Sequence, residues 1–384
     1  MKIVIAMDSF KGSMTSMEAG NAAKDGVLAA VEDAEVIVCP LADGGEGTLE
    51  ALAQTGMGKL VSVQVHDPLG REITANYMEV IQENGEKTVF MEMAQVAGLT
   101  LLEVSERDPK RTTTYGVGEL ICHALERGCQ KIVLGIGGSA TNDGGIGMLT
   151  ALGYRFLDKD GREICAEGDV LHALGAVQNI DASRVGKKIS ECSFCVACDV
   201  ENPLCGEMGA THMFAPQKGL KEEDCAIADC AMRSYSEAVV RFCGSDYRSA
   251  KGAGAAGGMG FALMSFLQAD IVSGAELVLR VTELQRHLQD ADFLLTGEGC
   301  VDGQTAMGKA PMKAAELAQK HGCKVWAFAG RLGEDVETCL QHGMDAVFAI
   351  SDEKTLLQEA MKRENAMENM KQTVMKKFVR EKSV

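Results

Sequence analysis

Short apolar runs recur along the chain, and each run ends in a loop of glycine, acidic, amide or hydroxyl residues. Apolar strands that alternate with helical segments are typical of a parallel α/β sheet. Ligands bind to such sheets beyond the carboxyl ends of the strands, so we expect the functional residues in these loops. The segments are KIVIAMDSFKG (2–12), EVIVCPLADGGEG (35–47), KIVLGIGGSATNDGGIG (131–147), FCVACDVENP (194–203), DFLLTGEGCVDG (292–303) and KVWAFAGR (324–331).

The hydrophobic pattern changes between residues 58 and 99, where apolar and polar positions alternate. The turn sequences DPLG (67–70) and ENGE (83–86) interrupt this alternation and predict antiparallel strands. The apolar runs that begin at residues 131 and 194 are assigned to the same region, with membership of the first sheet as the alternative. The strand-loop-helix pattern of the N-terminal region returns near residue 283.

These patterns predict an α/β protein of two domains, which suits a chain of 384 residues. Residues 1–60 and 285–384 are expected to form a doubly wound parallel-sheet (Rossmann-like) domain. Residues 61–284 are expected to form a mixed α/β domain inserted into it. The active site is expected in the cleft between the two domains.

Composition narrows the classes of function. The net charge of −17 argues against nucleic acid and anionic membranes as partners, because both need a basic surface. No apolar run reaches the length of a membrane span, so we expect a cytoplasmic protein. The 14 cysteines are scattered and are interpreted as reduced thiols, the Cys195/Cys198 pair included. A homodimer is left open.

The loop GIGGSATNDGG (135–145) carries the densest set of polar groups in the chain. It can be aligned with a dinucleotide fingerprint, with Asp158 as the ribose contact. Such a site needs a helix directly after the glycines, and the residues from Asn142 to Gly145 would interrupt that helix. Free N–H groups beside Ser139 favour the binding of a phosphate or a hydroxy acid.

Three further segments have two interpretations each. GQTAMGKA (303–310) nearly matches a phosphate-binding loop, but Ala310 lacks the hydroxyl that would hold Mg²⁺. KGAGAAGGMG (251–260) predicts a close approach of two backbone segments, with phosphate binding as the alternative. RDPKRTTT (107–114) is either a solvated linker or an anion-binding loop.

Taken together, the motifs resemble those of the type I bacterial glycerate kinases over nearly the whole chain. The resemblance rests on DSFKGS, PLADGGEGT, TTTYGVGEL, GIGGSATNDGG, CDVENPLCG, PQKG, GAGAAGG and TGEG..DGQT..GKAP in this order. It implies ATP-dependent phosphorylation of D-glycerate with Mg²⁺, feeding glycerate into glycolysis, and it favours 2-phospho-D-glycerate over the 3-phospho product. Cys300 stands where the family has an arginine, and Lys251 where a proline often precedes GAGAAGG.

Phosphoryl transfer needs cations, N–H donors, a metal ion and one base, and the loops at the strand ends carry candidates for each of these roles. Asp199 is the predicted base, since the strand VACD fixes its position, and Lys11 and Asp43 are the other predicted catalytic residues. The predicted substrate-binding residues are Asp8, Ser9, Ser139, Asn142, Asn202 and Lys218. The predicted nucleotide-binding residues are Gly44, Gly45, Gly137, Gly138, Glu298, Asp302, Gln304 and Lys309, and the predicted metal ligands are Asp143 and Glu46.

Two other functions are weighed against the kinase. A nicotinamide (NAD)-dependent hydroxy-acid dehydrogenase would use the glycine-rich loops for its cofactor. A non-catalytic sensor of sugar acids would use the same loops for binding alone.

Overall fold

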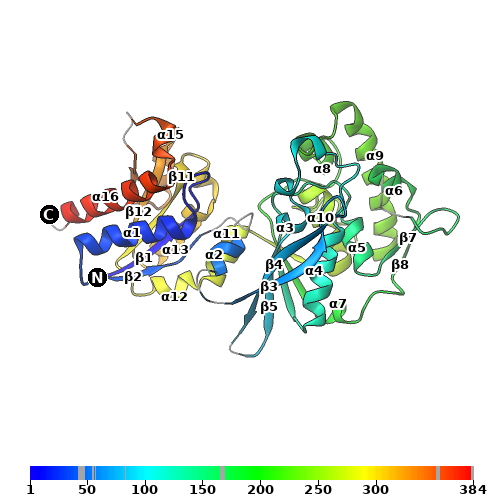
Figure 1. The fold of residues 1–384 in the computed structure, drawn as a ribbon, viewed down its shortest axis with the longest axis horizontal. Coiled ribbons are helices and arrows are strands. Elements are labelled where there is room, and N and C mark those ends of the chain that lie inside the picture. Colours follow the sequence, from blue (N-terminus) through cyan, green and yellow to red (C-terminus); the bar gives the residue numbers. More distant parts are fainter. Residues whose placement is uncertain are drawn as a thin grey trace. The chain divides into compact units, whose positions relative to one another are not determined.

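The computed structural model describes residues 1–41, 48–53, 56, 58–82, 84–164, 169–351 and 355–381. The chain divides into two compact units, whose elements are labelled in Figure 1. The first unit contains Met1–Asp43, Glu50–Met57 and Ala275–Val384, and the second contains Gly44–Leu49 and Gly58–Gly274. None of the described helices is long and apolar enough to cross a membrane.

The first unit is built on a parallel sheet with the strand order β13-β12-β11-β1-β2. Each neighbouring pair of strands in this sheet is parallel. The strands are β1 (Lys2–Met7), β2 (Glu35–Val38), β11 (Phe293–Val301), β12 (Lys324–Leu332) and β13 (Ala346–Ala349).

Helices cover both faces of this sheet because its strands are apolar on both sides. Side chains alternate along β1, so Ile3 and Ile5 pack on one face while Val4 packs on the other. The first face is covered by α1 (Ser16–Ala30) and α16 (Arg363–Glu381), which lie side by side in Figure 1. The second face is covered by α13 (Ala310–Lys320). The predicted doubly wound parallel sheet is confirmed.

The boundary between the two units differs from the predicted one. The second unit ends at Gly274, earlier than the predicted boundary at residue 284. The physical reason is packing, since Leu279 and Leu284 belong to the apolar core of the first unit. The remaining helices of this region are short, and they are α2 (Thr48–Ala53), α11 (Gly274–Val281), α12 (Leu284–Leu288), α14 (Glu337–Gln341) and α15 (Leu357–Ala360).

The second unit has a mixed sheet with the order β10-β9-β6-β5-β4-β3. The pairs β3/β4 and β4/β5 are antiparallel, as the alternation and the turn at Asp67–Gly70 predicted, and the other pairs are parallel. The runs at residues 131 and 194 therefore pair in this sheet. The strands are β3 (Lys59–His66), β4 (Glu72–Ile81), β5 (Lys87–Glu92), β6 (Lys131–Gly135), β9 (Ser193–Ala197) and β10 (Asp270–Val272), and a separate pair is β7 (Arg155–Leu157) with β8 (Asn179–Asp181).

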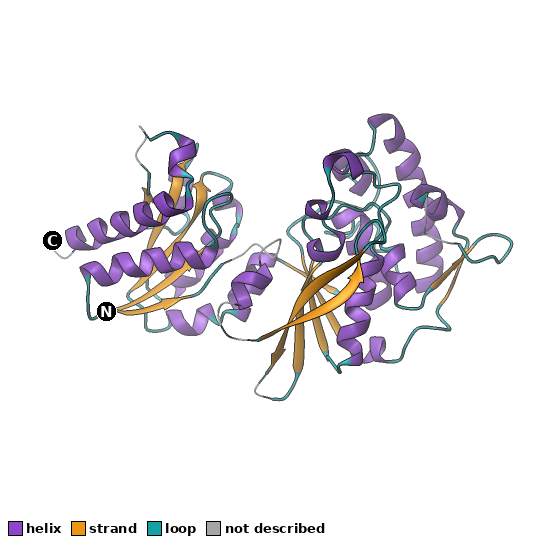
Figure 2. Ribbon diagram, viewed as in Figure 1, coloured by secondary structure: helices purple, strands orange, loops and turns teal. Residues whose placement is uncertain are grey.

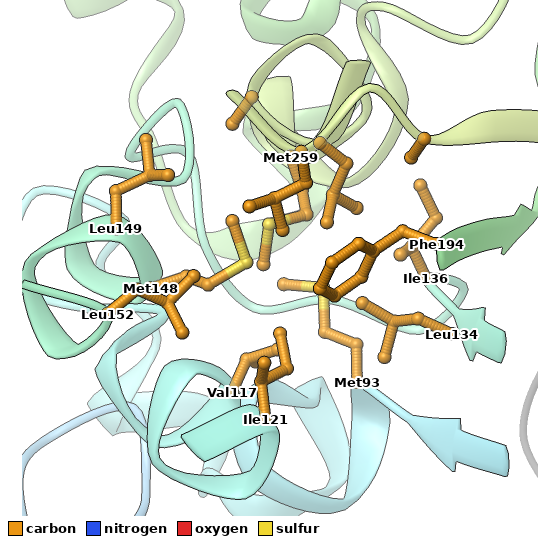
Figure 3. Close-up of a cluster of buried hydrophobic side chains, with 14 of the residues drawn as sticks. Met93, Val117, Ile121, Leu134, Ile136, Met148, Leu149, Leu152, Phe194 and Met259 are labelled. Atoms are coloured by element: carbon orange, nitrogen blue, oxygen red, sulfur yellow. The ribbon is translucent and has the colours of Figure 1, made fainter. Parts of the chain in front are cut away.

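Helices of the second unit enclose one large apolar core, and Figure 2 shows them packed around the mixed sheet. Figure 3 shows Val117 and Ile121 pointing toward Leu134, Phe194 and Met259. The helices are α3 (Ala94–Ala97), α4 (Tyr115–Glu126), α5 (Ile146–Ala151), α6 (Val170–Ala176), α7 (Lys188–Glu191), α8 (Ala210–Phe214), α9 (Glu222–Cys243) and α10 (Ala255–Leu267).

The backbone at the start of α10 lies in direct contact with the backbone of the loop after β6. Gly257 has a φ of +67°, and a Cβ at this position would lie 2.2 Å from the carbonyl oxygen of Thr141. The amide of Gly144 donates a hydrogen bond of 2.9 Å to the carbonyl of Gly257. Only glycine fits such a contact, so the close approach predicted for residues 251–260 is confirmed.

We expect Gly257→Ala to lower the free energy of unfolding by about 2–4 kcal/mol, because left-handed strain adds to a steric clash. Gly244→Ala is the matched control, since Gly244 has a φ of +73° and a Cβ there would meet nothing within 4 Å. The control should cost only about 1 kcal/mol, from strain alone. Urea unfolding measures both values, and equal losses in the two variants would contradict the close contact.

Candidate active site

The loop after β6 leaves the sheet at its carboxyl edge and delays the next helix. Gly138, Gly144 and Gly145 all have positive φ, and α5 begins only at Ile146. A dinucleotide site would need the helix directly after the first glycines, so this geometry favours the binding of a small anion. The predicted interruption of the helix is therefore confirmed.

Asp143 is the most heavily bonded side chain of this loop, and it is fully buried. Its carboxylate accepts hydrogen bonds from Thr114 N (2.9 Å), Thr114 Oγ1 (2.8 Å), Gly145 N (3.1 Å) and Gly147 N (3.3 Å). Burial raises the pKa of Asp143, although these hydrogen bonds act to lower it. Both oxygens accept from protein donors, Oδ2 three times and Oδ1 once, and the role of Asp143 as a metal ligand stays a prediction.

Lys218 is buried at the other side of the same loop, with 2% of the residue exposed. Its Nζ donates to Ser139 Oγ (2.8 Å) and to the carbonyl oxygen of Thr141 (2.7 Å). Burial lowers the pKa of Lys218 to about 7, and the charge of Asp143 acts in the opposite direction. The amine is therefore poised to gain a proton when an anion binds near it.

Several buried polar atoms around Lys218 have no hydrogen-bond partner among the described residues. They include Thr141 Oγ1, Asn142 Oδ1 and Arg107 Nε. The other side of the Asn142 amide donates to Thr211 Oγ1 at 3.1 Å. Buried polar atoms without partners are costly, so such a group is typical of a site that a ligand completes.

Arg107 reaches this region through its backbone. Its carbonyl oxygen lies 2.0 Å from the position of a Cβ on Gly219, the residue after Lys218. Arg107 is half-buried, its Nε has no hydrogen-bond partner among the described residues, and none of their ion pairs includes it. An unpaired guanidinium in a chain of net charge −17 favours the anion-binding interpretation of residues 107–114.

Asp199 follows β9 at the same edge of the sheet. Strands β6 and β9 pair in register from Lys131↔Ser193 to Gly135↔Ala197, so both loops begin at adjacent positions. Asp199 is exposed, whereas the side chain of Asn202 donates to the carbonyl of Met208 at 2.8 Å. Asp199 is therefore open to a substrate, while Asn202 is built into its own loop.

The other predicted residues gather at the carboxyl edge of the first sheet. Asp8 N donates to the carbonyl of Gly297 (2.8 Å), and Ser9 N donates to Asp8 Oδ1 (2.6 Å). Lys11 is exposed, and its amide nitrogen lies 3.7 Å from the position of a Cβ on Gly299. The loop after β1 thus runs along the end of β11.

Glu298 and Lys309 meet at the end of β11. Lys309 Nζ lies 3.4 Å from Glu298 Oε2, and Thr305 Oγ1 donates to Glu298 Oε1 at 2.8 Å. Burial raises the pKa of Glu298 against the influence of these two partners. Asp302 Oδ1 accepts from the amides of Gln304 and Thr305, and so begins the 3₁₀ turn Thr305–Met307.

Four predicted residues, Asp43, Gly44, Gly45 and Glu46, lie outside the described residues. Among the described residues, no group of three or more His, Cys, Asp or Glu side chains could hold a metal ion. The remaining predicted residues fall into one group in each unit, and that these groups share a single cleft stays a prediction.

Comparison with known proteins decides the family. The model of the glycerate kinase family matches residues 3–379. The chain belongs to the glycerate kinase family. It is 43% identical over 362 residues to Glycerate 2-kinase of Escherichia coli (strain K12), covering 94% of this chain and 93% of the relative. It is 40% identical over 373 residues to Glycerate kinase of Bacillus subtilis (strain 168), covering 97% of this chain and 96% of the relative.

A solved structure agrees with this family. The chain matches a crystal structure of a Salmonella typhimurium LT2 protein designated glycerate kinase 2, with a TM-score of 0.88 and 41% identity. The match covers 100% of this chain and 98% of the other. As a member of the glycerate kinase family, the protein is a phosphotransferase, which removes the dehydrogenase and the non-catalytic sensor from consideration.

Three residues that lie against the loop after β6 or beside Lys218 are not among the predicted site residues. Thr114 and Thr211 hold Asp143 and Asn142 through hydrogen bonds, and Arg107 lies beside Gly219. The hydroxyl run TTT and the cations of residues 107–114 were the available signal for two of them. Thr211 lies in α8, where no sequence motif marks it, so only its hydrogen bond with Asn142 identifies it.

Lys218→Met should change the pH dependence of stability. Above pH 7 the unfolded chain keeps a proton on Lys218 that the folded chain has lost, so this lysine makes stability rise with pH up to its ordinary pKa near 10.5. The free energy of unfolding of the wild type minus that of the variant should therefore grow by about 2 kcal/mol between pH 7 and pH 9.

Urea unfolding at each pH measures this difference. Lys221→Met is the control for the loss of a nearby lysine, since the side chain of Lys221 is 74% exposed. A constant difference between the wild type and Lys218→Met across this range would show that Lys218 is protonated in the folded protein.

Proposed function

We propose that the protein transfers the γ-phosphoryl group of ATP to a hydroxyl of D-glycerate and forms 2-phospho-D-glycerate, which feeds glycerate into glycolysis. The observation that carries this proposal is the buried loop of Ser139, Asn142 and Lys218 with its unpaired polar atoms. The choice of the 2-phospho product is supported by the name of the Escherichia coli relative, Glycerate 2-kinase.

The second unit binds glycerate in this proposal. A small carboxylate needs local cations in a chain of net charge −17, and Lys218 and Arg107 supply them. Ser139 and Asn142 add a hydroxyl and an amide that can hydrogen bond to the substrate's carboxylate and hydroxyl groups. Binding of the anion stabilises the charged form of Lys218, so the site gains a proton on binding near neutral pH.

The first unit binds the nucleotide in this proposal. Lys11 and Lys309 flank the end of β11, and Lys309 precedes the N-terminus of the eleven-residue helix α13. Cations near the positive end of a helix dipole are groups that neutralise phosphate oxygens. Asp302 shapes the loop that carries Gln304 toward solvent.

Mg²⁺ is proposed as the counter-ion that the nucleotide brings to the site. Mg²⁺ usually binds one or two carboxylates together with substrate phosphates and water. Among the described residues, no group of three or more His, Cys, Asp or Glu side chains could hold the ion by itself, which is consistent with an ion held chiefly by the nucleotide. Asp143 and Glu46 stay the proposed protein ligands, and Glu46 lies outside the described residues.

Asp199 is the proposed general base. Its carboxylate is exposed at the strand edge beside the loop of Ser139, where a substrate hydroxyl can come within about 3 Å. As the glycerate oxygen attacks the γ-phosphorus, Asp199 accepts its proton and the bond to the bridging oxygen of ADP breaks. Lys11 and Lys309 offset the negative charge that spreads over the transferred group.

The cytoplasm is the proposed compartment. The described cysteines are free thiols, which suits a reducing environment, and the reaction draws on ATP.

An assay of ADP release with D-glycerate tests the proposed reaction, and ³¹P nuclear magnetic resonance of the product distinguishes 2-phosphoglycerate from 3-phosphoglycerate. We expect ADP release that depends on D-glycerate and a product phosphorylated at position 2. A 3-phosphoglycerate product would overturn the regiochemistry alone. The absence of ADP release with D-glycerate would overturn the substrate.

Asp199→Asn should lower kcat by about 10²–10⁴-fold, the usual loss for a general base, with little change in the KM for ATP. Glu201→Gln is the matched control, because Glu201 is an exposed acid in the same loop that pairs with Lys251 on the surface. The control should keep kcat within about twofold, since exposed ion pairs contribute little. If Asp199→Asn retains more than about a third of the wild-type kcat, a different residue is the base.

A further inference from the structure

Cys129 and Cys192 form a pair of thiols that the proposed reaction does not use. Their sulfur atoms lie 3.8 Å apart, and the two residues are 7% and 9% exposed. Cys129 precedes β6 and Cys192 immediately precedes β9. The amide of Ser193 donates to the carbonyl of Gln130 at 2.9 Å, so the two backbones are already at the separation of adjacent strands.

The surroundings of the pair favour one thiolate and one thiol. The contact with Cys192 and the charge of Lys87 lower the pKa of Cys129, whereas burial and the charge of Glu79, which pairs with Lys87 at 3.4 Å, act to raise it. The same contact raises the pKa of Cys192, and burial adds to that effect. Lys87 is held nearby, since its Nζ donates to the carbonyl of Arg127 at 2.8 Å. Cys129 is therefore the nucleophile and Cys192 the second thiol.

The pair lies just below the surface at the amino ends of β6 and β9. Its neighbours in sequence, Gly128, Gln130, Glu191 and Ser193, are all exposed. The loops with Ser139 and Asp199 leave the opposite, carboxyl ends of the same two strands. A small oxidant can therefore reach the thiols from solvent, and a cross-link here does not involve the candidate active site.

We propose that Cys129 and Cys192 are a site of reversible oxidation, at which hydrogen peroxide produces an intramolecular disulfide bond between the amino ends of β6 and β9. In the first step the Cys129 thiolate attacks one peroxide oxygen, an S–O bond forms, the O–O bond breaks, and the departing hydroxide takes up a proton to become water. In the second step the Cys192 sulfur attacks the sulfenic acid, the S–S bond forms, the S–O bond breaks, and a second water leaves with the thiol proton. Two thiols are oxidised and one peroxide is reduced.

The disulfide has a predictable consequence for stability. It closes a loop of the chain between residues 129 and 192, and cross-links over long loops stabilise a fold by restricting the unfolded chain. The second unit should therefore unfold at a Tm several degrees higher after oxidation, and dithiothreitol should reverse the increase. The kcat should stay within about twofold of the reduced protein, because the strands' carboxyl ends are unchanged.

The test treats the full-length wild-type protein with hydrogen peroxide, blocks the remaining thiols with N-ethylmaleimide and maps the peptides by mass spectrometry. We expect a Cys129–Cys192 peptide that is two hydrogens lighter than the sum of its reduced parts. Because this readout uses the wild type, it does not depend on the folding of a variant. Absence of this peptide, or its replacement by other cysteine pairs, would overturn the proposal.

Two variants sharpen the result. Cys192→Ser removes the second thiol, so Cys129 should stop at the sulfenic acid, which dimedone labels, and the increase in Tm should be lost. Cys230→Ser is the matched control, because Cys230 is an exposed cysteine outside the pair, and its loss should leave the cross-link and the increase in Tm unchanged. An increase in Tm that survives Cys192→Ser would contradict the assignment.

Discussion

The buried carboxylate of Asp143 is the interaction on which the candidate glycerate site depends. A buried charge is stable only when hydrogen-bond donors replace the water it has lost, and Asp143 has donors from two segments of the chain. Thr114 stands before α4, and Gly145 and Gly147 stand at the start of α5. One side chain thus fixes where both helices begin relative to the polar loop.

Lys218 occupies the same loop with the opposite sign, and its situation is different. Its amine has two hydrogen-bond acceptors, Ser139 Oγ and Thr141 O, and neither carries a full charge. Burial is therefore not fully offset, and the pKa falls to about 7. Burial destabilises the charged form of Lys218 in the folded protein, and this cost is offset only when an anion binds near the amine. This arrangement suits a binding site, because the negative charge of the ligand supplies the counter-charge that the protein does not provide.

The two sheets present their candidate residues in the same way. In each unit the polar residues follow the carboxyl ends of parallel strands, so residues distant in sequence, such as Lys11 and Glu298, belong to neighbouring strands. None of the described site residues predicted from the sequence lies at the amino end of a strand. The thiol pair of Cys129 and Cys192 lies at such an end, so the proposed oxidation site and the candidate glycerate site lie at opposite ends of the same two strands.

Much of the fold was determined by the sequence itself. Period-two alternation and apolar runs identify strands locally, because a strand's side chains alternate between two environments whatever it pairs with. Gly144 and Gly145 likewise predict that the next helix is delayed, since a positive φ is a local property. The ordered motifs are specific to the family, and they do not depend on tertiary contacts.

Tertiary structure alone decided the environment of each polar residue. Asp143 and Asp199 look alike as acids at strand ends, yet one is fully buried beneath protein donors and the other is exposed. Arg107, Thr211 and Cys192 gain their importance from neighbours that lie far away along the chain. Burial, hydrogen bonding and the resulting pKa depend on those neighbours, and no local pattern encodes them.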